Sequence, residues 1–242
     1  AGDAGAEEEG ADRGDDPVVD QQRGFHRLAF QQQAGAFDRD AVLAVVNRWL
    51  AARKGEPAAA TNAPPIHAAT LRTEQRKLEQ THLVLARRTV SATSPDRFAA
   101  RIFAEIFGGG MASRLFQDVR ESRGLAYTID ASCDQHSDCG RISVYAGSDP
   151  KDAAEVVKII SDIWADLAAK GPTEAELARA KAVAAAQFAM AAEAPAARAG
   201  SSAYELLTFN RLVSVEEVLS HIAAVTIADV RRVAAESLAN PA

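Results

Sequence analysis

Residues 108–127 of the chain read GGGMASRLFQDVRESRGLAY, and this segment indicates which helices and strands lie before and after it. Its three consecutive glycines predict the end of a helix, because glycine is a poor helix former and a frequent helix terminator. The residues before them are apolar at helical spacing: Phe98, Ile102, Phe103 and Ile106. We expect that helix to start near Ser94 and Pro95, a short second helix from residue 112 to about residue 121, and a strand at 125–132.

Strand patterns surround this segment, and helix patterns follow it. Residues 70–76, 81–90 and 141–146 have strand character, and the polar segment 133–140 connects the strands on either side of it. A helix opens after Asp149-Pro150, and its apolar positions share one face: Val156, Val157, Ile160, Ile163, Trp164 and Leu167. Two capping boxes predict further helix starts: Thr173-x-x-Glu176 and Ser214-x-x-Glu217. Strands followed by helices predict an α+β fold, an antiparallel sheet covered on one face by helices.

The N-terminal part of the chain differs in composition from the rest. The whole chain has a formal charge of −6, and residues 1–16, with seven acidic residues and one arginine, account for that value. A charged segment without large apolar residues predicts a disordered tail, here residues 1–24, although a basic partner could also recognise it. The near-neutral remainder lacks the basic surplus of nucleic-acid-binding proteins.

One amphipathic helix is expected after this tail. Asp38 is a suitable N-cap, and the apolar residues after it form a stripe: Val42, Val45, Val46, Trp49 and Leu50. The glycine and prolines between Gly55 and Pro65 predict a linker. A single helix cannot bury a core by itself, so we expect it to pack on another part of the protein.

Two cysteines and a histidine form the pattern Cys133-x2-His136-x2-Cys139. Three interpretations are open: metal binding, a disulfide within a hairpin, and ordinary residues at strand ends. Structural zinc sites use four ligands and no second Cys/His cluster follows, which disfavours a metal.

The sequence has no apolar run long enough to span a membrane and no signal peptide, so we expect a soluble protein. The sequence does not distinguish between three compartments for the protein: the bacterial cytoplasm, the periplasm and an organelle matrix.

The segment 108–127 closely resembles the C-terminal half of pitrilysin/insulinase-type zinc metallopeptidases, whose relatives include the mitochondrial processing peptidase. Matching segments continue in the family's order at residues 80–82, 145–150, 173–181, 214–219 and 225–230. Residues 35–38 and the helix after them are similar to the end of the preceding, zinc-bearing half. After the acidic tail predicted at 1–24 from composition, the resemblance implies a remnant of the preceding half plus linker at 25–65 and the C-terminal half-domain at 66–242.

Active members of this family hold zinc in the other half, through the motif His-x-x-Glu-His. Two histidines four residues apart lie on one helix face and can share a metal ion, while the glutamate acts as general base. The histidines of this chain are His26, His67, His82, His136 and His221, and no two of them are four residues apart. The resemblance therefore implies no cofactor in this chain, zinc in a partner half or subunit, and no activity of the chain alone.

The same resemblance implies two catalytic residues, Arg120 and Tyr127. They match a family arginine and tyrosine that face the zinc and donate hydrogen bonds to the oxyanion of peptide hydrolysis. Gly108–Gly110 match a loop that touches substrate in some relatives. Plainer interpretations exist, because Tyr127 shares strand parity with Leu125 and Ile129 and could be a core residue, and Arg120 could be a solvated helix residue.

Two functions follow from these observations. The first is the non-zinc half or subunit of a zinc metalloendopeptidase, which completes the peptide-cleavage chamber and stabilises the oxyanion. The alternative is a catalytically inactive structural or peptide-binding subunit of the same family in a larger assembly. The presence of both Arg120 and Tyr127 favours the first, because a purely structural subunit does not need them.

Overall fold

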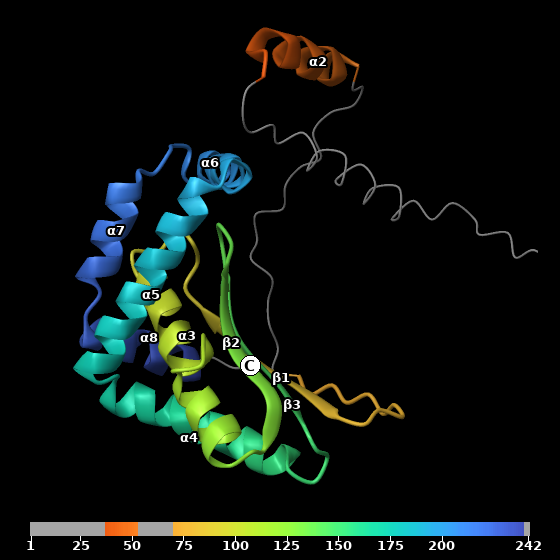
Figure 1. Cartoon of the computed structure of the whole chain (residues 1–242), viewed down its shortest axis with the longest axis vertical. Coiled ribbons are helices and arrows are strands. Elements are labelled where there is room, and N and C mark those ends of the chain that lie inside the picture. Colours follow the sequence, from red (N-terminus) through yellow and green to blue (C-terminus); the bar gives the residue numbers. More distant parts are fainter. Residues whose placement is uncertain (1–36, 53–69, 240–242) are drawn as a thin grey trace, which may run out of the picture.

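The computed structural model describes residues 37–52 and 70–239. The predicted acidic tail and the predicted linker between Gly55 and Pro65 lie outside these ranges, and the three-part division of the chain stays a prediction. Within the described ranges the elements follow the order α2, β1, α3, η1, β2, β3, α4, α5, α6, α7, α8 (Figure 1). One antiparallel sheet and a larger helical layer confirm the α+β fold class predicted from the sequence.

The sheet contains β1 (Thr81–Thr89), β2 (Ala126–Gln135) and β3 (Gly140–Ser148), in the spatial order β1-β3-β2. Both pairs of neighbours are antiparallel. A turn over residues 136–139 joins β2 to β3, and it is closed by the His136 N–H, which donates to the Cys139 carbonyl at 2.8 Å. This turn is shorter than the predicted polar connection at 133–140, because residues 133–135 continue to pair with β3.

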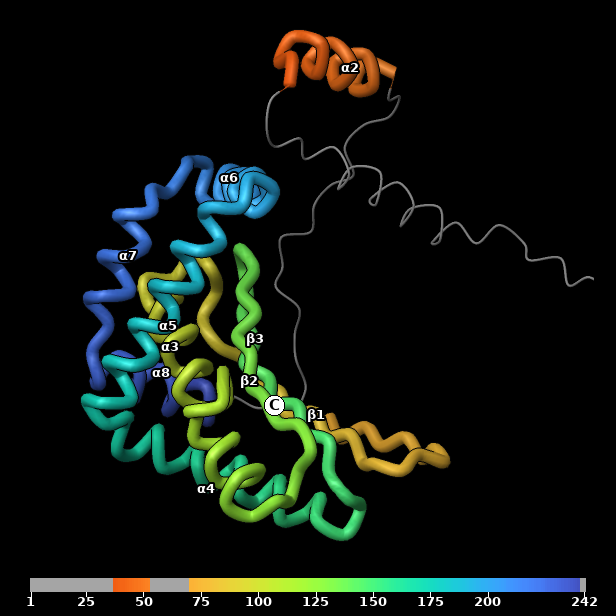
Figure 2. The backbone as a smooth tube through the Cα atoms, viewed as in Figure 1, coloured from red at the N-terminus to blue at the C-terminus, as the bar shows by residue number. Residues whose placement is uncertain are grey.

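The predicted strand at 70–76 is wrong. These residues are exposed and form neither helix nor strand, and Figure 2 shows the segment extending away from the helical layer before β1 begins. Its charged side chains bond locally, as when Arg76 Nε donates to Glu74 Oε1 at 2.8 Å. The segment has strand-forming residue types but no apolar face that a neighbouring layer could bury, and burial is what gives such a pattern its strand preference.

The α-helices that follow β1 gather on one side of the sheet (Figure 1). Helix α3 (Arg97–Gly108) packs on β2, and α8 (Ile227–Ala239) packs on β1 and on α4 (Ala153–Lys170). The remaining helices of the layer are α5 (Glu174–Glu193), α6 (Pro195–Phe209) and α7 (Val215–Ala224). None of the helices in the described part of the chain combines the length and hydropathy needed to cross a lipid bilayer.

Most predicted helix starts are confirmed by their caps. The Thr173 hydroxyl accepts from the Glu176 N–H at 3.2 Å, and the Glu176 carboxylate accepts from the Thr173 N–H at 2.7 Å, which completes the capping box of α5. Ser214 caps α7 through the Glu217 N–H. Asp38 caps α2 (Arg39–Ala51), as predicted, although no residue of that helix is buried.

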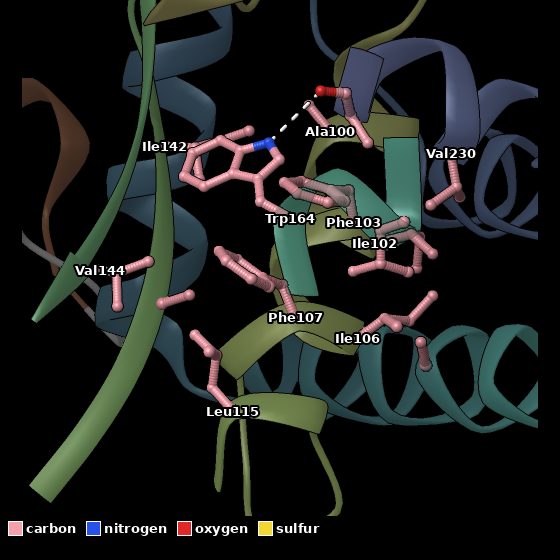
Figure 3. Packing of buried hydrophobic residues seen from close by; sticks show 14 of the residues in the cluster. Ala100, Ile102, Phe103, Ile106, Phe107, Leu115, Ile142, Val144, Trp164 and Val230 are labelled. Carbon is pink, nitrogen blue, oxygen red and sulfur yellow. Dashed lines mark hydrogen bonds between the residues drawn. The ribbon is translucent and has the colours of Figure 1, made fainter. Parts of the chain in front are cut away.

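The core lies between α3, α4, α8 and the helix-facing side of the sheet. Phe103 and Phe107 of α3 pack against Trp164 of α4 with ring centroids 5.6 and 5.0 Å away (Figure 3). The Trp164 indole N–H donates to the Ala234 carbonyl at 3.3 Å, so its one polar atom is satisfied inside the core. Ile142 of β3 is fully buried and closes the other side of this cluster.

Candidate functional site

Tyr127 lies at an irregularity in strand β2. Ala126 pairs with Ser148 and Thr128 pairs with Gly147, so one extra residue, Tyr127, is inserted between consecutive pairs. The insertion changes the parity of the strand: Ala126 and Ile129 are both buried, although they are three residues apart. Tyr127 is consequently 59% exposed. The interpretation of Tyr127 as a core residue, based on unbroken alternation, is therefore wrong.

Arg120 lies on η1 (Phe116–Ser122), a π-helix that forms most of the short helix predicted after the glycines. Val119 is fully buried beneath it, so the next residue emerges on the exposed side. The Arg120 guanidinium lies over the Phe116 ring, 4.8 Å from its centroid, and this contact restricts the side chain without burying it. The sequence could not separate an α-helix from a π-helix here, because so few buried positions define the period.

A tight turn connects these two residues. The Gly124 N–H donates to the Arg120 carbonyl at 3.2 Å, and the Leu125 N–H donates to the Val119 carbonyl at 2.9 Å. Gly124 has a φ of 64°, a backbone conformation that favours glycine. Arg120 and Tyr127 are therefore exposed at the two ends of one turn, and no hydrogen bond joins their side chains within the described residues.

Arg114 braces this turn against the helical layer. Its guanidinium donates to Glu176 at 2.7 and 2.9 Å and to Asp166 at 2.8 Å, which links the start of η1 to α4 and α5. Hydrogen bonding from Arg114 lowers the pKa of Glu176 to about 2, with further help from Thr173. The capping box alone did not indicate this second role of Glu176. Paired, bidentate geometry of this kind makes the brace specific to arginine.

Two of the three glycines are required by close packing. A Cβ on Gly108 would lie 2.7 Å from the backbone nitrogen of Ala131, and one on Gly109 would lie 2.6 Å from the Cα of Glu105. Gly110 has no such neighbour, since its closest contact would be a Glu105 carboxylate oxygen at 3.7 Å. Helix α3 ends at Gly108, as predicted. Contact of Gly108–Gly110 with substrate stays a prediction.

Gly109 and Gly110 border a cavity of about 310 Å³, whose wall also includes Glu105 and Arg179. Burial raises the pKa of the Glu105 carboxyl, although Arg179 opposes this shift. The cavity adjoins the turn that carries Arg120, through Ser113, whose hydroxyl donates to the Gly110 carbonyl at 2.6 Å.

The face of the sheet opposite the helices carries a pair that the sequence did not reveal. His82 Nδ1 lies 2.8 Å from the Tyr145 hydroxyl, and the two rings are stacked. Tyr145 lies between Val84 and Asp130 on the neighbouring strands. His82 belongs to one of the segments that resemble the family, but only the register of β1 against β3 places it beside Tyr145.

The Cys133, His136 and Cys139 pattern does not form a metal site. Over residues 37–52 and 70–239, no three His, Cys, Asp or Glu side chains are grouped where they could hold a metal ion. The two cysteines are free, which also removes the disulfide interpretation. Burial raises the pKa of the Cys133 thiol to about 12, so this cysteine behaves as a small apolar residue at a strand end.

The fold and the sequence together define a domain of the peptidase M16 family. Residues 34–183 match the family model described as the peptidase M16 inactive domain. The chain belongs to this family, as the motifs predicted. A Streptomyces coelicolor protein named an uncharacterized zinc protease is 33% identical over 219 residues, which cover 88% of this chain and 45% of that relative. This chain therefore spans less than half the length of that relative.

Solved structures agree with this assignment. A conserved protein from Enterococcus faecalis superimposes with a TM-score of 0.71 and 28% identity, over 82% of this chain and 47% of that one. A chain of complex III from Candida albicans superimposes with a TM-score of 0.70 at 21% identity, over 84% of this chain and 50% of that one. The second similarity concerns the fold alone.

Proposed function

We propose that this chain is the non-zinc half of a zinc metalloendopeptidase, in which Arg120 and Tyr127 stabilise the oxyanion of peptide-bond hydrolysis. The observation that supports this most is the strand irregularity at Tyr127, which leaves the phenol 59% exposed at the end of a braced turn. An exposed tyrosine there has no role in the core. Bulges that redirect a side chain are frequent next to active sites.

The chain contributes hydrogen-bond donors. Hydrolysis of a peptide bond places negative charge on the carbonyl oxygen, and a guanidinium and a phenol can both donate to that oxygen or to the neighbouring substrate backbone. The Phe116 ring and the Gly124 turn hold the two donors in place before substrate arrives. Preorganised donors of this kind are effective because they need no rearrangement in the transition state.

The zinc belongs to the partner half. No His-x-x-Glu-His motif exists in this sequence, and no metal-ligating group forms among the described residues. Zinc bound there would polarise the scissile carbonyl and activate water. Completion of the peptide chamber by this chain is consistent with the relatives named zinc proteases, of which it matches less than half.

Reconstitution tests this proposal. The chain is mixed with a half that carries His-x-x-Glu-His, and peptide cleavage is followed by mass spectrometry. We expect Arg120→Ala and Tyr127→Phe each to lower the rate by about 10²–10³-fold, as for loss of one oxyanion donor. Arg123→Gln is the matched control, because Arg123 is exposed on the same turn and, among the described residues, pairs only with Asp118 and Glu155.

The alternative function predicts a different pattern. If the chain is a structural or peptide-binding subunit, the reconstituted mixture binds peptide without cleaving it, or cleaves it equally well with both variants. Either result contradicts the roles proposed for Arg120 and Tyr127.

A further inference from the structure

A second cavity, of about 320 Å³, lies on the helical side of the molecule. Its wall includes Arg97, Phe98, Arg101, Phe188, Tyr204 and Phe209, from α3, α5 and α6. The Tyr204 hydroxyl donates to the Gln135 carbonyl at 3.1 Å, which places the cavity beside the end of β2. Tyr127 lies near the opposite end of that strand, roughly 25 Å away at the usual rise per residue. The cavity is therefore separate from the Arg120 and Tyr127 turn.

Arg97 makes this cavity unusual. Its guanidinium lies 4.5 Å from the centroid of the Phe98 ring and 5.2 Å from that of Phe209. No carboxylate in the described part of the chain lies within ion-pair distance of it. Burial lowers the pKa of Arg97, and the charge of Glu217 opposes that shift. Aromatic faces compensate only partly for the lost hydration of a cation, so a bound anion would be favoured here.

The nearby carboxylates are already engaged. Glu205 also lines the cavity, but its carboxylate accepts from the Val213 N–H at 2.9 Å. Glu217 accepts from the Arg211 guanidinium at 2.8 Å. Arg101 adds a second positive charge to the wall, and in the part of the chain that the structure describes it donates only to the neutral amide of Gln135, at 3.2 Å. The cavity thus combines an apolar, aromatic wall with a surplus of positive charge.

We propose that this cavity binds a small amphipathic carboxylate. The carboxylate would pair with Arg97, and its apolar chain or ring would lie against Phe98, Phe188 and Phe209. The volume is within the range of small-molecule pockets, about 300–1,000 Å³, and such pockets have largely apolar walls with few, well-placed polar groups. A fatty acid and the C-terminus of a short peptide share this chemistry. The inference uses neither Arg120 nor Tyr127 and is independent of the proposed function.

Calorimetric titration of the full 242-residue chain tests the proposal. Octanoate represents the fatty-acid source and the dipeptide Gly-Phe the peptide source, and each is compared with its neutral amide. We expect at least one of the two acids to bind saturably, with a Kd below about 1 mM, and its amide to bind at least about 10-fold more weakly, because a charged hydrogen bond is lost. The tighter acid identifies the source.

Three variants assign the binding to this cavity. Arg97→Met should weaken binding of the acid by about 10-fold or more. Arg198→Gln is the matched control, an exposed arginine of α6 outside the cavity wall, and should leave the affinity unchanged. Ser201→Trp should block the cavity from an exposed position in its wall without removing Arg97. A thermal melt of each variant confirms folding, and Ser201→Trp carries the test if Arg97→Met does not fold.

Several outcomes overturn the proposal. They are the absence of saturable binding of both acids, equal binding of acid and amide, and unchanged affinity of a folded Arg97→Met or Ser201→Trp variant.

Discussion

Arg97, the first residue of α3, and Arg114, just before η1, are both partly buried, but they have opposite kinds of neighbours. Arg114 is held by two carboxylates, Glu176 and Asp166, at normal hydrogen-bond distances. Arg97 is held by two aromatic rings and has no carboxylate beside it in the described ranges. Arg114 therefore fixes the fold around a site, whereas Arg97 keeps its charge available to an external anion.

The regions around the two arginines also differ in how tightly they are packed. The segment 113–127, which contains the Arg120 and Tyr127 turn, is anchored by fully buried Leu115 and Val119. Helix α6 has no buried residue, and its Leu207 is 89% exposed. Stability is therefore concentrated under the Arg120 and Tyr127 turn, and the cavity wall on α6 is the more weakly packed part.

Leucine truncation compares the two regions directly. Leu115→Ala should lower the free energy of unfolding by about 2–5 kcal/mol, because it leaves a cavity in a filled core. Leu207→Ala should change it by less than about 0.5 kcal/mol, because the side chain is already in solvent. Urea unfolding monitored by circular dichroism measures both. Equal effects would contradict the uneven distribution of stability.

Removal of each arginine is the next test. Arg114→Met should lower the free energy of unfolding by about 1–3 kcal/mol, because Glu176 then loses the partner of its partly buried carboxylate. Arg97→Met should change it by less than about 1 kcal/mol, since only contacts with two rings are lost. Urea unfolding midpoints of the two variants and the parent measure these losses of stability. A larger loss for Arg97→Met would show that Arg97 is structural.

The brace also predicts a dependence on pH. The pKa of Glu176 is about 2 in the folded protein, against an ordinary value of 4.5, so its contribution to stability is complete above about pH 4.5 and is lost as the pH falls toward 2. Arg114→Met removes the main cause of the lowered pKa. The variant should lose less stability than the parent between pH 5 and pH 3, as measured by urea midpoints. Parallel losses would contradict this role of Arg114.

The smallest expected effect on stability belongs to the candidate site itself. Tyr127→Phe and Arg120→Ala should each change the free energy of unfolding by less than about 0.5 kcal/mol, because both side chains are exposed. Thermal melts of the isolated chain provide the measurement. A marked destabilisation by Tyr127→Phe would indicate that the hydroxyl supports the fold.

Much of the fold could be predicted from local signals. The glycine run, the capping box at Thr173 and the apolar period of α3 each depend on neighbouring residues, and all three are confirmed. The exposed position of Tyr127 could not be predicted from alternation, because a single inserted residue reverses the parity of the strand. The segment at 70–76 has strand-forming residue types but no apolar face to bury, so residue types without an alternating apolar pattern were not enough to predict a strand.

The residues of the candidate site were predicted from family resemblance and not from local sequence signals. Arg120 and Tyr127 were identified by resemblance, and their physical environment came only from the structure. The Arg114–Glu176 pair and the Arg97 cavity join residues more than 50 positions apart along the chain, so spacing gave no signal for either. A partly buried arginine can be recognised as paired or unpaired only when its neighbours in space are known.

The role of Tyr127 as an oxyanion donor is tested most directly by kcat. The measurement uses a reconstituted enzyme that contains Tyr127→Phe in this chain and an intact zinc-bearing half. Loss of a donor that acts on the developing oxyanion should lower kcat by about 100-fold or more while KM changes little. A kcat equal to that of the parent enzyme would contradict the assignment of Tyr127 as an oxyanion donor.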